Sequence, residues 1–135
     1  MGIRRKAREL ALNALYQSEL TGSPPAGKFD FFCENFQANK KAIPYARELI
    51  FGLAGKWEEI NALIEQNSEH WRLNRMSVID RNIMRIAAFE LQYIDDVPSS
   101  VAINEAIEIA KRFSTDDAAP FINGILDAVR KALET

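Results

Sequence analysis

Apolar residues recur at helical spacing along nearly the whole chain, and no segment shows the sustained alternation that is typical of a strand. One example is the set Phe29, Phe32, Cys33 and Phe36, which follows the i, i+3, i+4, i+7 pattern. A chain of 135 residues with 47% hydrophobic residues can bury a substantial core. We therefore predict an all-α fold, a compact bundle of about seven helices in a single domain covering residues 1–135.

Local signals indicate where these helices begin and end. The first is expected over residues 3–20, because the segment TGSPPAG at 21–27 is typical of a loop. A longer helix opens near Pro44, and Gly52 and Gly55 are expected to bend it or break it into two. The expected caps of the later helices are Ser77, then Ser99 or Ser100, then the segment 115–117.

The helix expected from Ser77 to about Ile94 is apolar around most of its circumference, so it should lie centrally. Glu90 falls in the middle of its apolar stripe. A buried carboxylate must be paired or hydrogen-bonded. We therefore expect Glu90 to have a structural partner, which the sequence does not identify, rather than a role as an acid or base.

Several classes of protein are excluded or disfavoured by the sequence. The longest stretch without a charged residue is nine residues, whereas a membrane-spanning helix needs about 18 apolar ones. The single cysteine, Cys33, cannot form an internal disulfide and is expected to be a core thiol in a cytoplasmic protein. His70 has no Cys or carboxylate nearby at metal-ligand spacing, and no phosphate loop or dinucleotide motif occurs. We predict no catalytic residues, no metal site and no cofactor.

Positive charge is concentrated at the start of the chain. Arg4, Arg5, Lys6 and Arg8 contribute +4, whereas the whole chain has a net charge of −2, so the remainder is −6. Cations at a helix N-terminus oppose the helix macrodipole, and arginines at i and i+4 repel each other. Something outside the helix should compensate, and phosphate is favoured because guanidinium groups bind its oxygens in a bidentate manner. The alternative is a charged end that is merely tolerated in solvent.

The first helix also carries apolar residues away from its alanine stripe. Leu12 and Tyr16, four residues apart, share the side of the helix that carries Arg5. An apolar pair beside arginines predicts a docking patch or a platform for base stacking, unless other helices cover both sides of this helix. Phe121, at the edge of the last helix's apolar arc, presents the same choice between an interface and the core.

Two blocks of the sequence carry recognisable motifs. The first leads from Arg4-Arg5-Lys6-Ala7-Arg8-Glu9 into Ala14-Leu15-Tyr16-Gln17. The second contains Asp80-Arg81 through Arg85 to Glu90-Leu91, then Asp96-Val97-Pro98, Val101-Ala102-Ile103-Asn104-Glu105-Ala106, Ala110-Lys111 and Phe121-Ile122-Asn123-Gly124-Ile125-Leu126-Asp127. Together they resemble the NusB family of transcription antitermination factors. The match is specific over residues 3–17 and 77–127, whereas between 21 and 75 only the helical character agrees.

The resemblance implies an all-helical fold of two small helical bundles without catalytic activity. It implies binding of the single-stranded boxA element of nascent ribosomal RNA leader transcripts. It also implies a protein partner, NusE, which is the free form of a small-subunit ribosomal protein. In the family this complex joins RNA polymerase, suppresses termination and aids ribosomal RNA maturation.

Site residues are carried over by position. The resemblance implies that the cations Arg4, Arg5, Lys6 and Arg8 contact RNA. It places four further residues on the RNA or protein-partner surface, namely Tyr16, Asp80, Asp117 and Phe121. We add Leu12 to the predicted partner surface because it lies beside Tyr16 on the helix. Phe121 is also tied to self-association in some members, so a homodimer stays open. Ala118 departs from the serine often found at its position, which weakens the transfer of a polar contact there.

Three other classes of protein are alternatives to an RNA-binding one. A helical protein-binding scaffold would use the basic end to contact an acidic partner. Certain ribosomal RNA methylases carry a similar helical module before a methyltransferase domain, for which 135 residues leave no room. A DNA-binding helix-turn-helix protein needs a basic recognition helix, whereas the helix expected over 101–113 is basic only at its end.

Overall fold

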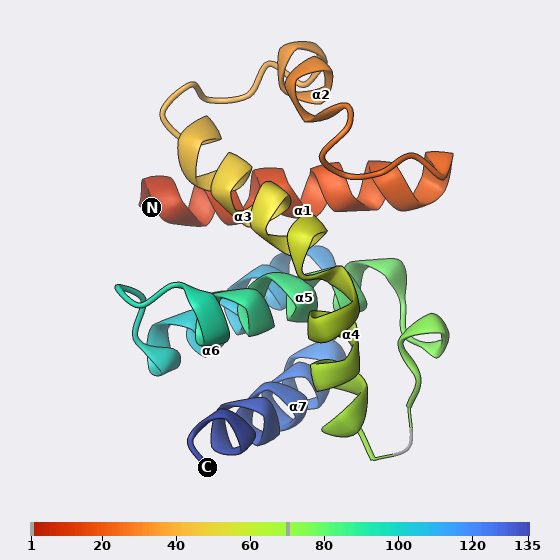
Figure 1. Cartoon of the computed structure of the whole chain (residues 1–135), viewed down its shortest axis with the longest axis vertical. Helices are drawn as coiled ribbons and strands as arrows, with labels where there is room; N and C mark the ends of the chain where they lie inside the picture. The colour runs from red at the N-terminus through yellow and green to blue at the C-terminus, as the bar shows by residue number, and fades with distance from the viewer. Residues whose placement is uncertain (1, 70) are drawn as a thin grey trace. The chain divides into compact units, whose positions relative to one another are not determined.

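The computed structural model describes residues 2–69 and 71–135 (Figure 1). His70, considered above as a possible metal ligand and rejected on its spacing, lies outside the described residues. The described chain is all-α, as predicted. Its elements are α1 (Ile3–Thr21), α2 (Phe29–Asn35), α3 (Ile43–Gly55), α4 (Trp57–Gln66), a 3₁₀ turn (Leu73–Arg75), α5 (Val78–Tyr93), α6 (Ser99–Phe113) and α7 (Ala118–Leu133).

The chain divides into two compact units, Met1–Lys56 and Trp57–Thr135. The boundary lies where α3 ends at Gly55 and α4 begins at Trp57, so the break that the glycines predict is confirmed. The first unit has nine Lys+Arg against five Asp+Glu, a net charge of +4. The second has eight against fourteen, a net charge of −6. The basic tip therefore belongs to a unit whose remaining charges balance, and the acidic surplus belongs wholly to the other unit.

In the first unit, α3 crosses α1 and packs along it, and α2 packs on α3 (Figure 1). The alanine stripe of α1 is buried, which allows the α3 backbone to come close. α1 ends at Thr21, and the next residue, Gly22, has a φ of 74°, the left-handed conformation that favours glycine. Phe29 and Cys33 on α2 are buried as predicted, and burial raises the pKa of the Cys33 thiol, so the neutral thiol is favoured.

In the second unit, α5 packs against α4, α6 and α7, which confirms its predicted central place. Every residue of α5 from Asn82 to Glu90 is buried. Glu90 is only 1% exposed and is not left without a partner. The Ser77 hydroxyl caps α5 by accepting a hydrogen bond from the Asp80 amide at 3.0 Å, as its position predicts.

The cap predicted for α6 is wrong, and the cap predicted for α7 is correct in position but makes no side-chain hydrogen bond. α6 begins at Ser99, so its N-cap is Pro98, which has no side-chain donor or acceptor. α7 begins after Asp117, whose backbone is helical and whose side chain makes no capping bond. The N-cap of α6 therefore lies one residue before the serine that local propensity favours, whereas α7 has its N-cap inside the predicted segment but lacks the capping hydrogen bond.

A buried polar network links α4 to α5 within the second unit. The Arg85 Nε donates to Asn61 Oδ1 at 2.8 Å, and its Nη1 donates to Asn82 Oδ1 at 2.8 Å. The guanidinium carbon lies 4.3 Å from the centre of the Trp57 ring. Arg85 is therefore a core residue of this unit, held by its hydrogen bonds and by an aromatic face.

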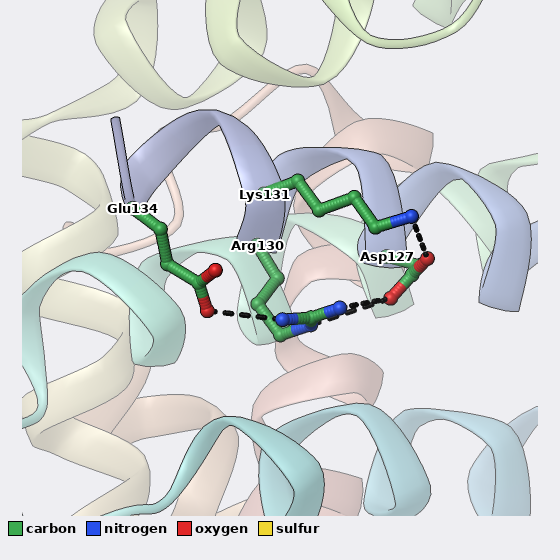
Figure 2. A network of polar contacts seen from close by, with 4 residues as sticks. All are labelled: Asp127, Arg130, Lys131 and Glu134. Carbon is green, nitrogen blue, oxygen red and sulfur yellow. Dashed lines mark hydrogen bonds and ion pairs between the residues drawn. The ribbon is translucent and has the colours of Figure 1, made fainter.

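The C-terminal turns of α7 carry a surface ion-pair network (Figure 2). The Arg130 guanidinium lies between Asp127, at 2.7 Å, and Glu134, at 2.9 Å, and Lys131 pairs with Asp127 at 3.2 Å. Hydrogen bonds from Arg130 and then Lys131 lower the pKa of Asp127 below its ordinary value. The basic residues also suit the negative end of the helix.

Replacing Arg130 by alanine is expected to raise the pKa of Asp127 toward its ordinary value of 3.8. Because the pKa is lower in the folded protein than in the unfolded chain, the network stabilises the fold above the unfolded-state pKa. That contribution is lost as the pH falls through the folded-state pKa. Titration of the Asp127 carboxyl carbon by NMR measures the change, and identical curves for both proteins would show that Arg130 does not stabilise the charged carboxylate.

Among the described residues, no helix is long and apolar enough to cross a membrane.

Candidate nucleic-acid and partner surfaces

The N-terminal turns of α1 form the basic cluster, which we define as Arg4, Arg5, Lys6 and Arg8. The first turn of α1 contains no acidic residue, and Gly2 supplies no side-chain cap. Lys6 is exposed and Arg4 and Arg5 are half-buried, but Arg8 is only 4% exposed. The sequence places these cations together, yet the structure separates the buried Arg8 from the three that solvent reaches.

Part of the repulsion between these cations and the helix N-terminus is offset by a residue of α3. The Arg4 guanidinium carbon lies 4.3 Å from the centre of the Tyr45 ring, and that of Arg8 lies 5.7 Å away. An aromatic face carries partial negative charge and attracts a cation placed over it. Tyr45 was not predicted as a site residue, because nothing in its local sequence reveals that α3 brings it to the start of α1.

Leu12 and Tyr16, the two apolar residues predicted away from the alanine stripe of α1, differ in exposure. Leu12 is 2% exposed, so its side chain is covered within the folded chain and offers no surface to a partner. The alternative of coverage on both sides of the helix is correct at this position. Tyr16 is half-buried and keeps part of its surface accessible.

One pocket of the second unit is lined by Asp80, Asp117 and Phe121. The first and last of these lie 41 residues apart in the sequence. We call it the acidic pocket; its volume is about 400 Å³ and its lining also includes Trp71, Arg75, Met76, Ser77, Thr115 and Ala118. Packing of α7 against α5 brings these residues together. Three residues that the sequence assigned to a partner surface therefore share one site.

Two contacts shape the acidic pocket. The rings of Trp71 and Phe121 meet edge to face, with 6.1 Å between centroids, and Trp71 is about half exposed. The Ser114 hydroxyl donates to Asp80 Oδ1 at 2.6 Å, which fixes that carboxylate. The site thus offers aromatic surface beside carboxylates. Trp71 and Arg75 were missed because they lie in the region where the sequence carries only general helical character.

A second pocket, of about 380 Å³, lies in the first unit between α1, α2 and the loop that joins them. Its lining is mainly apolar and includes Phe31 and Phe36, both largely exposed, with Lys28 as its one charged residue. The pocket has no titratable pair or ligand set that would indicate a reaction. Nothing in the sequence pattern predicts it, because Phe29, Phe32 and Phe36 share the apolar stripe expected to face the core and no role was predicted for Phe31.

Comparisons with known proteins agree over nearly the whole chain. The NusB family model matches residues 5–131. The transcription antitermination protein NusB of Desulfosudis oleivorans is 49% identical, over 98% of this chain and 88% of that protein. The structure of T. maritima NusB superposes with a TM-score of 0.86 at 40% identity, covering 95% of this chain and 90% of that one.

A further solved structure includes partners. It contains the antitermination factors NusB and NusE in complex with double-stranded RNA, and it superposes with a TM-score of 0.85 at 29% identity, covering 98% of each chain. From the motifs, the fold and these matches, the chain belongs to the NusB family.

Proposed function

We propose that this chain is a transcription antitermination factor that binds the boxA element of nascent ribosomal RNA leader transcripts together with NusE. In this role it suppresses termination in the RNA polymerase antitermination complex, in the bacterial cytoplasm, and aids ribosomal RNA maturation without catalysing a reaction. The observation that carries the proposal is the division of charge, +4 in one unit and −6 in the other. The predicted RNA-binding cations belong to the positive unit, and the predicted partner residues Asp80 and Asp117 belong to the negative one. The NusB family assignment supports it.

The basic cluster is the proposed RNA surface. Arg5, Lys6 and the accessible part of Arg4 contact phosphates, and the half-buried Tyr16 lies on the same helix where a base could stack. Three phosphate contacts on a single strand give a salt slope of only about −2. Such a surface binds weakly alone, so a protein partner is needed to reach useful affinity.

The acidic pocket is the proposed contact for NusE, a ribosomal protein and hence an RNA-binding one. Asp80 and Asp117 supply negative charge, and Phe121 beside Trp71 supplies aromatic contact area. Opposite charge speeds encounter and favours the correct orientation. A uniformly basic RNA-binding protein would repel a cationic partner, whereas the second unit, with its net charge of −6, attracts one.

The test is a calorimetric titration with a boxA single strand, a scrambled strand and a boxA duplex, each with and without NusE. We expect weak binding of the single strand alone and tighter, sequence-dependent binding when NusE is present. The duplex arm is included because the related NusB and NusE complex was solved with double-stranded RNA. Equal affinity for the matched and scrambled strands with NusE present would contradict the antitermination proposal.

The alternative function is a helical protein-binding scaffold without sequence-specific RNA binding. It predicts that NusE binds equally well whether or not RNA is added. Self-association through Phe121 would compete with NusE at the acidic pocket, so light scattering over a concentration series, with and without NusE, distinguishes a homodimer from the complex.

A further inference from the structure

Tyr45 contacts two residues of the basic cluster, Arg4 and Arg8. It lies in the first full turn of α3 and is 8% exposed, and the guanidinium groups of Arg4 and Arg8 both lie within 6 Å of its ring centre. These arginines are four residues apart on α1, so they occupy the same side of that helix. One buried ring from another helix therefore serves two cations that would otherwise repel each other.

The two arginines differ in what remains accessible. Arg8 is almost fully buried, whereas Arg4 lies nearer the ring centre and is still half-exposed. An arginine held against an aromatic face has fewer rotamers to lose when it binds a ligand, so its binding costs less entropy. The ring also offsets part of the repulsion that the helix macrodipole imposes on cations in the first turns.

We propose that Tyr45 is a positioning residue for RNA binding. Its ring holds Arg4 in place for a phosphate, and Arg8 acts as a buried support on the same ring rather than as an RNA contact. The proposal rests on the proposed function, because it assigns roles within the same RNA surface. It also divides the cluster that the sequence treats as four equivalent cations.

The test compares Tyr45→Leu with Tyr45→Phe. Loss of the ring is expected to weaken binding of the boxA strand about fivefold to tenfold, as removal of a partly desolvated cation–π contact does. The magnitude of the salt slope should fall by about 0.7 as one phosphate contact is lost. Tyr45→Phe keeps the ring, so its affinity and salt slope should stay near those of the unaltered protein.

Two controls separate positioning from general damage to the fold. Phe29→Leu removes another buried ring of the same unit, whose centre lies 5.5 Å from the guanidinium carbon of Arg47, a residue outside the basic cluster, and should leave RNA affinity unchanged. In an Arg4→Ala background, Tyr45→Leu should weaken binding much less than in the unaltered protein, because its effect passes mainly through Arg4. Equal losses in both backgrounds would overturn the proposal.

NMR gives a measurement that does not depend on RNA. The Arg4 Nε–H resonance should be displaced by the ring current in the unaltered protein and in Tyr45→Phe, and should return to its usual position in Tyr45→Leu. If the unaltered protein binds no RNA with NusE present, the proposed function fails, and the role of Tyr45 fails with it. If RNA binds normally but Tyr45→Leu matches the unaltered protein, only the positioning role is overturned.

Discussion

Reversing the charges of Arg5 and Lys6 together, as Arg5→Glu with Lys6→Glu, is expected to weaken binding of the boxA strand by roughly a hundredfold. Each loses a charge-assisted hydrogen bond to phosphate, worth about 1.5 kcal/mol or more. Both side chains are at least partly exposed, so the helical circular-dichroism signal and the melting temperature should stay nearly unchanged. Titration of labelled RNA at two salt concentrations measures both the affinity and the salt slope.

The matched control is Lys40→Glu with Lys41→Glu. It makes the same change in net charge within the same unit, at two exposed lysines that lie outside α1. We expect a much smaller loss of affinity. If both double variants weaken binding equally, RNA responds to the overall charge of the unit and the assignment of the basic cluster is wrong. Arg8 is omitted because a glutamate at that buried position, facing the Tyr45 ring, would destabilise the fold.

Replacing Arg85 by alanine is expected to lower the free energy of unfolding by about 3 kcal/mol, because buried polar groups lose their hydrogen-bond partner. The change leaves the side-chain oxygens of Asn61 and Asn82 without the donor that now satisfies them, and it removes the cation from the face of Trp57. Denaturant unfolding followed by circular dichroism measures the effect.

Arg130→Ala serves as the control for this substitution. Arg130 makes two ion pairs, but they lie on the surface of α7, where water and salt screen them (Figure 2). We expect it to change the unfolding midpoint only slightly. A comparable loss of stability in both variants would show that burial of the Arg85 network is not what makes it important.

The helices were largely predictable because their signals are local. Apolar spacing located them, the glycines at 52 and 55 marked the end of α3, and Ser77 was correctly identified as a cap. The cap at Ser99 was wrong, and Asp117 is an N-cap without a side-chain hydrogen bond, because the exact start of a helix depends on how the chain approaches from the preceding turn. Local propensity competes there with the packing of whole helices.

The candidate surfaces were predicted in part. The concentration of charge at the start of α1 can be read from the sequence, because charge is a property of composition and needs no fold. Exposure is different, since it depends on which other segment covers a side chain. For Leu12 the sequence left a surface patch and coverage by other helices open, and the residue is buried, whereas Phe36 belongs to the predicted apolar stripe and is exposed beside a pocket.

The sequence alone therefore determined the all-α class, the helix positions and the distribution of charged residues. Apolar periodicity is a pattern within a few turns of helix, and charge follows from residue identity. Only the tertiary structure decided that Tyr45 meets Arg4 and Arg8, that Asp80 and Phe121 share a pocket, and that Arg8 is buried. These facts depend on the crossing of α3 over α1 and of α7 against α5. Contacts between residues far apart in sequence follow from the packing of whole helices, which no local pattern records.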